Sequence, residues 1–164
     1  MTSIYNLSKL DDNTLLGQLT RWIGRGRKNE AQILAHISEV DARRLYARQA
    51  YSNMFAYCID ALPLSGAAAL RRITAARASR RFHVLLEKVA SGELHLCAIK
   101  LLAPHLNDSN CAQLVALATH TSKRTLEKRL AERFPKEPVK DSIRKLPKRR
   151  LPGARCAVRG QAEA

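Results

Sequence analysis

Residues 54–81 read MFAYCIDALPLSGAAALRRITAARASRR, and this stretch decides the fold that the sequence predicts. An apolar helix runs up to Pro63, which ends it because proline cannot donate the backbone hydrogen bond that a helix needs. Ser65 then caps a second helix, predicted over residues 66–78. Two helices joined by a short turn, the second of them basic and slender, are typical of a helix-turn-helix that reads DNA.

The second helix begins with small residues and is rich in arginine further along. Gly66 to Ala68 keep its first turn slim, as a helix must be to enter the major groove. Arg71 and Arg72 are predicted to point outward, toward guanine or toward phosphate. The residues predicted for its buried side are Ala69, Leu70, Ile73 and Ala76. The predicted DNA-binding residues are Ser65, Ala67, Ala68, Arg71, Arg72, Arg77, Arg80, Arg81, Lys123 and Arg124. The alternative is a helix that packs closely through its alanines and leaves its arginines in solvent.

Apolar residues also recur at helical spacing before this stretch, over residues 10–40. Ser8 begins this region with a capping-box-like start. Gly24 and Gly26 interrupt its helix propensity, so either two helices or one bent helix would satisfy the pattern. Trp22 and His36 are interpreted as packing residues rather than ligands, because neither has a polar constellation beside it.

Further helices are predicted downstream, each with a local start or stop signal. Tyr51-Ser52-Asn53 is predicted to supply the cap of the helix that precedes Pro63, with Ser52 before its apolar run. Residues 82–89 form another amphipathic helix, and Pro104 stops the one that follows. Ser122 caps a last helix whose exposed face is strongly basic.

The composition supports an all-α fold and a cytoplasmic protein. Of the 164 residues 46% are hydrophobic but only 5% are aromatic, so the core must be built mainly from Leu, Ala, Ile and Val. No stretch resembles a signal peptide or approaches the roughly 20 apolar residues that span a bilayer. The four cysteines form no C-x-x-C pair, which argues against a disulfide framework and a zinc knuckle.

The charge of the chain indicates a polyanionic partner. The formal net charge is +15, and double-stranded DNA is favoured over a membrane because no basic stretch lies against a long apolar face. A solvated basic surface without a partner is the alternative. Residues 1–134 are predicted to form the helical domain. Residues 135–164, with four prolines and no apolar period, are predicted to be a disordered basic tail that adds non-specific affinity.

Residues 64–96, LSGAAALRRITAARASRRFHVLLEKVASGELHL, resemble the helix-turn-helix of ParB-type partition proteins. In those proteins a serine-capped recognition helix is followed by an apolar helix and then by a turn of the Ser-Gly-Glu/Lys-Leu type. This chain has the same order of elements, with Ser65 as the cap and Ser91 to Leu94 as the turn. The resemblance implies that the helix after Ser65 recognises DNA.

A wider resemblance extends to about Leu146. Its signposts are LAHISEVDARRLY (34–46), YS (51–52), FAYC (55–58), AAR (75–77), RRF (80–82), SGELHL (91–96), LLAPHL (101–106) and DSIRKLP (141–147). Together they are similar to the amino-terminal helical region of a family of bacterial HNH endonuclease proteins, in which an HNH nuclease module follows. The resemblance implies a bacterial, nucleoid-associated protein that engages DNA.

The residues of an HNH site itself are missing from the sequence. Such a site needs a histidine to activate water and further residues to hold a divalent metal. Only 18 residues follow Leu146, and none of them is histidine. The five histidines are dispersed through predicted helices without a nearby set of carboxylates: His36, His83, His95, His105 and His120. His95 and His105 are interpreted as core or surface packing residues. We therefore expect no catalytic residue, no metal site, no cofactor and no small-molecule substrate.

The sequence thus favours an all-α DNA-binding module without catalytic activity of its own. Two alternatives stay open. One is an HNH endonuclease fragment whose catalytic part is missing. The other is a helical scaffold that docks an acidic protein or a second copy of the chain, and a homodimer stays open in either case.

Overall fold

In the computed structural model of the protein, residues 6–135 are described, and they form eight α-helices without any β-strand. In chain order these are α1 (Asp12–Ala42), α2 (Leu45–Arg48), α3 (Met54–Asp60), α4 (Gly66–Arg81), α5 (Val84–Ser91), α6 (Leu96–Leu102), α7 (Cys111–Ala118) and α8 (Lys123–Arg133). The predicted all-α fold is confirmed. The predicted tail lies outside the described residues from position 136 onward.

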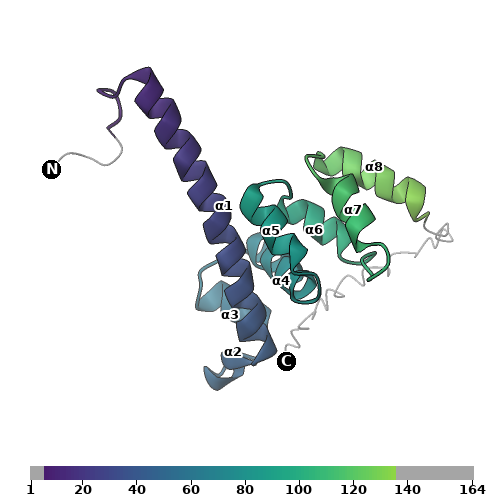
Figure 1. Ribbon diagram of the computed structural model, residues 1–164. Coiled ribbons are helices and arrows are strands. Elements are labelled where there is room, and N and C mark those ends of the chain that lie inside the picture. The colour runs from purple at the N-terminus through teal and green to yellow at the C-terminus, as the bar shows by residue number, and fades with distance from the viewer. Residues whose placement is uncertain (1–5, 136–164) are drawn as a thin grey trace, which may run out of the picture.

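α1 is a single helix of 31 residues, and its N-terminal half extends away from the other helices (Figure 1). The Asp11 carboxylate caps it by accepting a hydrogen bond from the Thr14 amide at 2.9 Å, so the start predicted at Ser8 is too early. Gly24 and Gly26 neither end nor split the helix. Each glycine costs about 1 kcal/mol against alanine, which is too little to stop a helix with good helix formers on both sides.

α4 lies at the centre of the fold, between two hydrophobic clusters. The smaller cluster joins Ala69, Ile73 and Ala76 of α4 to α1 and α3. The larger cluster joins Ala75 to α1 on one side and to α5, α6, α7 and α8 on the other. The three alanines are completely buried, and their small side chains allow neighbouring helices to approach α4 closely. Close packing through alanine is therefore confirmed for these three residues.

The remaining helices continue outward from this centre. α2 and α3 lie at the C-terminal end of α1, whereas α7 and α8 lie beyond α6 (Figure 1). Gly92 ends α5 with a φ of 85°, a left-handed conformation that glycine adopts without strain. α6 ends at Leu102, two residues before Pro104, as the proline predicts.

Side-chain caps begin several of these helices. The predicted caps Ser65 and Ser122 are confirmed, because each hydroxyl accepts a hydrogen bond from a backbone amide in the first turn, at 3.4 and 3.2 Å. The cap of α3 lies within the predicted segment Tyr51-Ser52-Asn53, but it is Asn53 and not Ser52. Asn53 occupies the capping position, and its Oδ1 accepts from a backbone amide at 2.8 Å.

Two predictions of packing also fail. Trp22 is 63% exposed, because it lies on the part of α1 that no other described helix covers. His36 is exposed as well, and its Nδ1 lies 2.7 Å from the Gln32 carbonyl oxygen of its own helix.

Candidate nucleic-acid interface

One side of α4 stays free of both hydrophobic clusters, and we call this side the open face. Its residues follow one another at helical spacing: Ala67, Leu70, Arg71, Thr74, Arg77 and Arg81. Leu70, predicted to be buried, is 46% exposed here. The reason is that α4 buries Ala75 and Ser79 as well as Ala76. Its buried side is therefore rotated away from Leu70.

Arg72 lies on the buried side of α4, against α1. Its Nη2 donates a hydrogen bond to Oε2 of Glu30 at 2.9 Å, and its Nε lies 2.9 Å from Oε1. The two side chains are only 21% and 24% exposed. The predicted outward orientation of Arg72 is wrong, because the guanidinium neutralises a half-buried carboxylate on the neighbouring helix.

Arg77 projects from the open face and pairs with Asp41 near the end of α1. Its Nε donates to Oδ2 at 2.7 Å and its Nη2 to Oδ1 at 3.2 Å, in the bidentate geometry typical of arginine and carboxylate. This hydrogen bonding to Asp41 raises the pKa of Arg77 above its ordinary value. The side chain of Arg77 remains 62% exposed, so one edge of the guanidinium still faces solvent.

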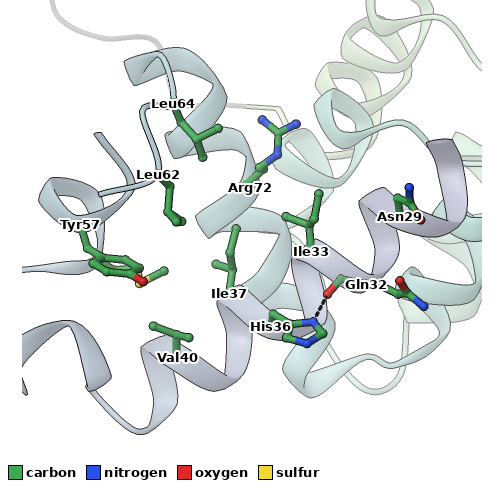
Figure 2. A pocket seen from close by; sticks show the side chains of 11 residues that line it. Asn29, Gln32, Ile33, His36, Ile37, Val40, Tyr57, Leu62, Leu64 and Arg72 are labelled. Atoms are coloured by element: carbon green, nitrogen blue, oxygen red, sulfur yellow. Dashed lines mark hydrogen bonds between the residues drawn. The ribbon is translucent and has the colours of Figure 1, made fainter. Parts of the chain in front are cut away.

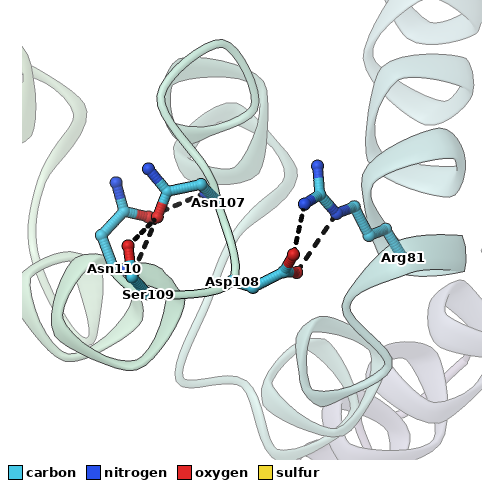
Figure 3. A network of polar contacts seen from close by, with 5 residues as sticks. All are labelled: Arg81, Asn107, Asp108, Ser109 and Asn110. Atoms are coloured by element: carbon cyan, nitrogen blue, oxygen red, sulfur yellow. Dashed lines mark hydrogen bonds and ion pairs between the residues drawn. The ribbon is translucent and has the colours of Figure 1, made fainter.

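Arg81 closes the open face at the C-terminal end of α4 (Figure 3). Its Nη2 donates to Oδ2 of Asp108 at 2.6 Å and its Nε to Oδ1 at 3.3 Å. Asp108 belongs to the loop between α6 and α7, where the backbone amides of Asn107 and Asn110 each donate to the other's Oδ1 at 2.8 Å. The pair is exposed, at 57% and 79% of the two side chains, so it stabilises the fold only weakly.

A shallow hollow lies beside these two arginines. Its volume is about 390 Å³, and it separates the open face from the C-terminal end of α6. The residues that line it are Thr74, Arg77, Ala78, Arg81, Phe82, Ala103 and Leu106. Its rim is therefore basic on the side of α4 and apolar on the side of α6.

The other predicted DNA-binding residues occupy three different places. Ser65 and Ala67 are exposed at the start of α4, where Ala68 is half-buried. Arg71 is half-buried on the open face and has no acidic partner among residues 6–135. Arg80 is exposed near the C-terminal end of α4, outside the open face.

Lys123 and Arg124 lie on α8, which packs on α6 rather than on α4. Lys123 pairs with Glu127 at 3.5 Å, whereas Arg124 has no ion pair within the described part of the chain. The fold thus brings Arg71, Arg77 and Arg81 onto one face. It leaves the basic residues of α8 as a separate surface.

An apolar groove of about 600 Å³ opens between α1, α3 and the turn before α4 (Figure 2). Its lining residues are Asn29, Gln32, Ile33, His36, Ile37, Val40, Met54, Tyr57, Leu62, Leu64 and Arg72. None of these lining residues is a carboxylate or a cysteine. The groove therefore offers a mostly apolar surface, with His36, Tyr57 and Arg72 as its titratable side chains.

His95 and His105 have local structural roles. His95 caps α6, since its Nδ1 accepts from the Ala98 amide at 3.0 Å. The ring of His105 stacks on that of Phe134 with the centroids 4.4 Å apart. Within residues 6–135, no group of three or more His, Cys, Asp and Glu side chains could hold a metal ion.

Comparison with known proteins gives no relative for this arrangement. No protein-family model, curated protein or solved structure matches the chain.

Among the helices described, none combines the length and the apolar character needed to cross a lipid bilayer.

Proposed function

We propose that the chain binds double-stranded DNA through the open face of α4, without catalysing a reaction on it. The observation that carries this proposal is the set of three arginines, Arg71, Arg77 and Arg81, on one uncovered helix face that begins with small residues. The charge around them supports it. Residues 6–135 contain 20 Lys and Arg against 11 Asp and Glu.

The paired arginines are compatible with this role. The ion pairs of Arg77 and Arg81 are largely exposed on the arginine side, and exposed pairs contribute roughly 0–1 kcal/mol to stability. A phosphate group can therefore replace Asp108 at Arg81 at little cost, whereas at Arg77 it would share the guanidinium with Asp41, whose side chain is only 16% exposed. Arg72 has no part in this proposal, because its guanidinium is committed to Glu30.

Equilibrium binding to duplex DNA across a salt series tests the proposal. Replacing Arg71 and Arg77 with alanine should weaken binding and flatten the plot of log affinity against log salt by about 0.9 for each phosphate that is no longer neutralised. Arg21→Ala is the matched control, because it removes an exposed arginine from the part of α1 that extends away from α4. An unchanged slope in the double variant, or an equal loss of affinity in the control, would overturn the assignment of the open face.

The resemblance to HNH endonuclease proteins belongs to the same proposal. The chain then corresponds to the helical, DNA-engaging region of such a protein, in the bacterial cytoplasm and near the nucleoid. Incubation with plasmid DNA and Mg²⁺ or Mn²⁺ should leave the DNA intact. Metal-dependent cleavage that persists through purification and is abolished by EDTA would contradict the non-catalytic assignment.

A helical protein-interaction scaffold is the second candidate. The apolar groove between α1 and α3 and the exposed apolar residues of α1 favour it. Failure to retain duplex DNA even at low ionic strength would support the scaffold over the DNA-binding module.

A further inference from the structure

The N-terminal half of α1 carries an apolar stripe that no part of residues 6–135 covers. Its residues are Leu15, Leu16, Leu19, Trp22 and Ile23, which are between 36% and 63% exposed. They recur at intervals of three and four residues, so they lie along one side of the helix. We call this set the α1 stripe.

This part of α1 also lacks the support that a helix of its length needs. An isolated helix of about 12–15 residues is marginal in water even when its sequence favours helix. Here three glycines lower the helix propensity further, and a side chain at Gly17, Gly24 or Gly26 would meet nothing within 4 Å. A partner that supplies apolar contacts along the α1 stripe would therefore stabilise this segment.

The charges on either end of the stripe identify this partner. Asp11 and Asp12 precede the stripe and Arg25 and Arg27 follow it, whereas Arg21 and Lys28 lie on the opposite side of the helix. Asp12 and Arg25 are 13 positions apart, which corresponds to about 20 Å along a helix. A second copy of the same helix in the opposite direction presents the complementary order of charges.

We propose that two copies of the chain associate through their α1 stripes, with the helices antiparallel and crossing near Leu19. Residues equally far from Leu19 then come opposite each other, so Leu15 faces Ile23 and Leu16 faces Trp22 of the other copy. Asp12 comes opposite Gly26, beside Arg25, where the missing side chain leaves room for the carboxylate. A parallel pair would instead bring the aspartates together and the arginines together, which is unfavourable.

Trp22 and Arg25 are already arranged for this contact. The guanidinium of Arg25 lies over the Trp22 ring at 5.1 Å from its centroid, so the arginine is held at the edge of the stripe. An interface with apolar residues at its centre and charged pairs at its rim is the usual anatomy of a protein–protein contact.

Trp22 also provides the readout, since it is the only tryptophan in the chain. Sedimentation equilibrium should show a dimer at high protein concentration, and dilution should shift the Trp22 emission to longer wavelength as the ring becomes exposed. Leu19→Glu should give a monomer whose emission does not change on dilution. Leu70→Glu is the matched control, because it changes a comparably exposed leucine on α4 and should leave the dimer intact. Far-UV circular dichroism of both variants verifies that the domain remains folded.

A charge exchange tests the direction of the two helices. Asp12→Arg and Arg25→Asp should each weaken the dimer at least severalfold, because each places like charges opposite one another. The double variant should restore the dimer, since the two ends then exchange their charges and remain complementary. Failure of the double variant to recover would overturn the antiparallel arrangement. A monomer at all concentrations, or a Trp22 shift that appears only with lipid vesicles or DNA, would overturn the proposal as a whole.

Discussion

Glu30 of α1 and Arg72 of α4, 42 positions apart in the chain, form an ion pair at the interface of the two helices, in which Nη2 of Arg72 donates a hydrogen bond to Oε2 of Glu30. Arg72 borders the apolar groove, and Glu30 lines a hollow together with Val89 and Leu94 of the larger cluster. It accounts for the one arginine of α4 that turns away from solvent. Because both charges are largely shielded from water, each depends on the other for its compensation.

Removing one partner of this pair should destabilise the protein more than removing both. Glu30→Gln leaves the guanidinium of Arg72 half-buried without its counter-charge, and we expect a loss of about 1–3 kcal/mol in the free energy of unfolding. Adding Arg72→Met should recover part of that loss. Urea unfolding of the single and double variants measures the difference. Equal stability of the single variant and the unmodified protein would show that the pair contributes nothing.

The alanines of α4 should tolerate no enlargement where they face a cluster. Ala75→Leu and Ala76→Leu insert volume between closely packed helices and should each cost about 1–3 kcal/mol in the free energy of unfolding. Ala67→Leu is the matched control on the open face and should change stability by less than about 0.5 kcal/mol. Chemical unfolding of the three variants measures these changes. Similar effects at all three positions would contradict the central placement of α4.

The side chain of Asn53, and not that of Ser52, should stabilise the start of α3. Asn53→Ala removes the acceptor for a first-turn amide and should lower the free energy of unfolding by about 1 kcal/mol. Ser52→Ala, one residue earlier, should have a much smaller effect. Thermal unfolding of the two variants distinguishes them, and the reverse order of stability would reinstate Ser52 as the cap.

Replacing glycine with alanine should destabilise the protein at Gly92 and stabilise the helix at Gly24. At Gly92 the φ of 85° disfavours any other residue, and the new Cβ would lie 2.5 Å from the Arg27 guanidinium. We therefore expect a loss of about 1–2 kcal/mol in the free energy of unfolding. At Gly24 the helix has open space, and alanine should increase the helical signal of α1. Chemical unfolding reports the first effect and far-UV circular dichroism the second.

Acid should weaken the fold partly through Glu93. Hydrogen bonds from Lys88 and Ser91 lower the pKa of its carboxyl from the ordinary value of 4.5. A lowered pKa in the folded state gives a stabilisation that is complete above pH 4.5 and is lost as the pH falls through the lowered value. Glu93→Gln should therefore reduce the decline of the melting temperature as the pH falls below 4.5. Lys88→Met should reduce it too, because it removes the largest cause of the shift.

The local features of this fold were predictable from sequence, because they depend on neighbouring residues. The helices on either side of Pro63 and the caps Ser65 and Ser122 follow from signals within one turn. The error at Ser52 is of the same kind, since Asn53 is an equally good capping residue and the pattern does not choose between them.

The orientation of α4 depends on the tertiary structure and was not predictable. Spacing indicated one buried side through Ala69 and Ile73, but Ala75 contacts a second cluster that is built mostly from later helices. The acidic partners of the arginines were missed for the same reason. Asp41 and Asp108 lie 36 and 27 positions from Arg77 and Arg81, and only the folded chain brings them together.

The position of α4 between two clusters also determines how the domain can come apart. Ala69, Ile73 and Ala76 on one side and Ala75 on the other belong to the same rigid helix, so displacing α4 opens both clusters at once. Loss of α3 and loss of α5–α8 should therefore be thermodynamically coupled, and the helices that pack around α4 should unfold in a single cooperative transition. If the chain is cut between α3 and α5, neither fragment can bury both faces of α4. The domain therefore cannot be divided into two stable parts at this helix.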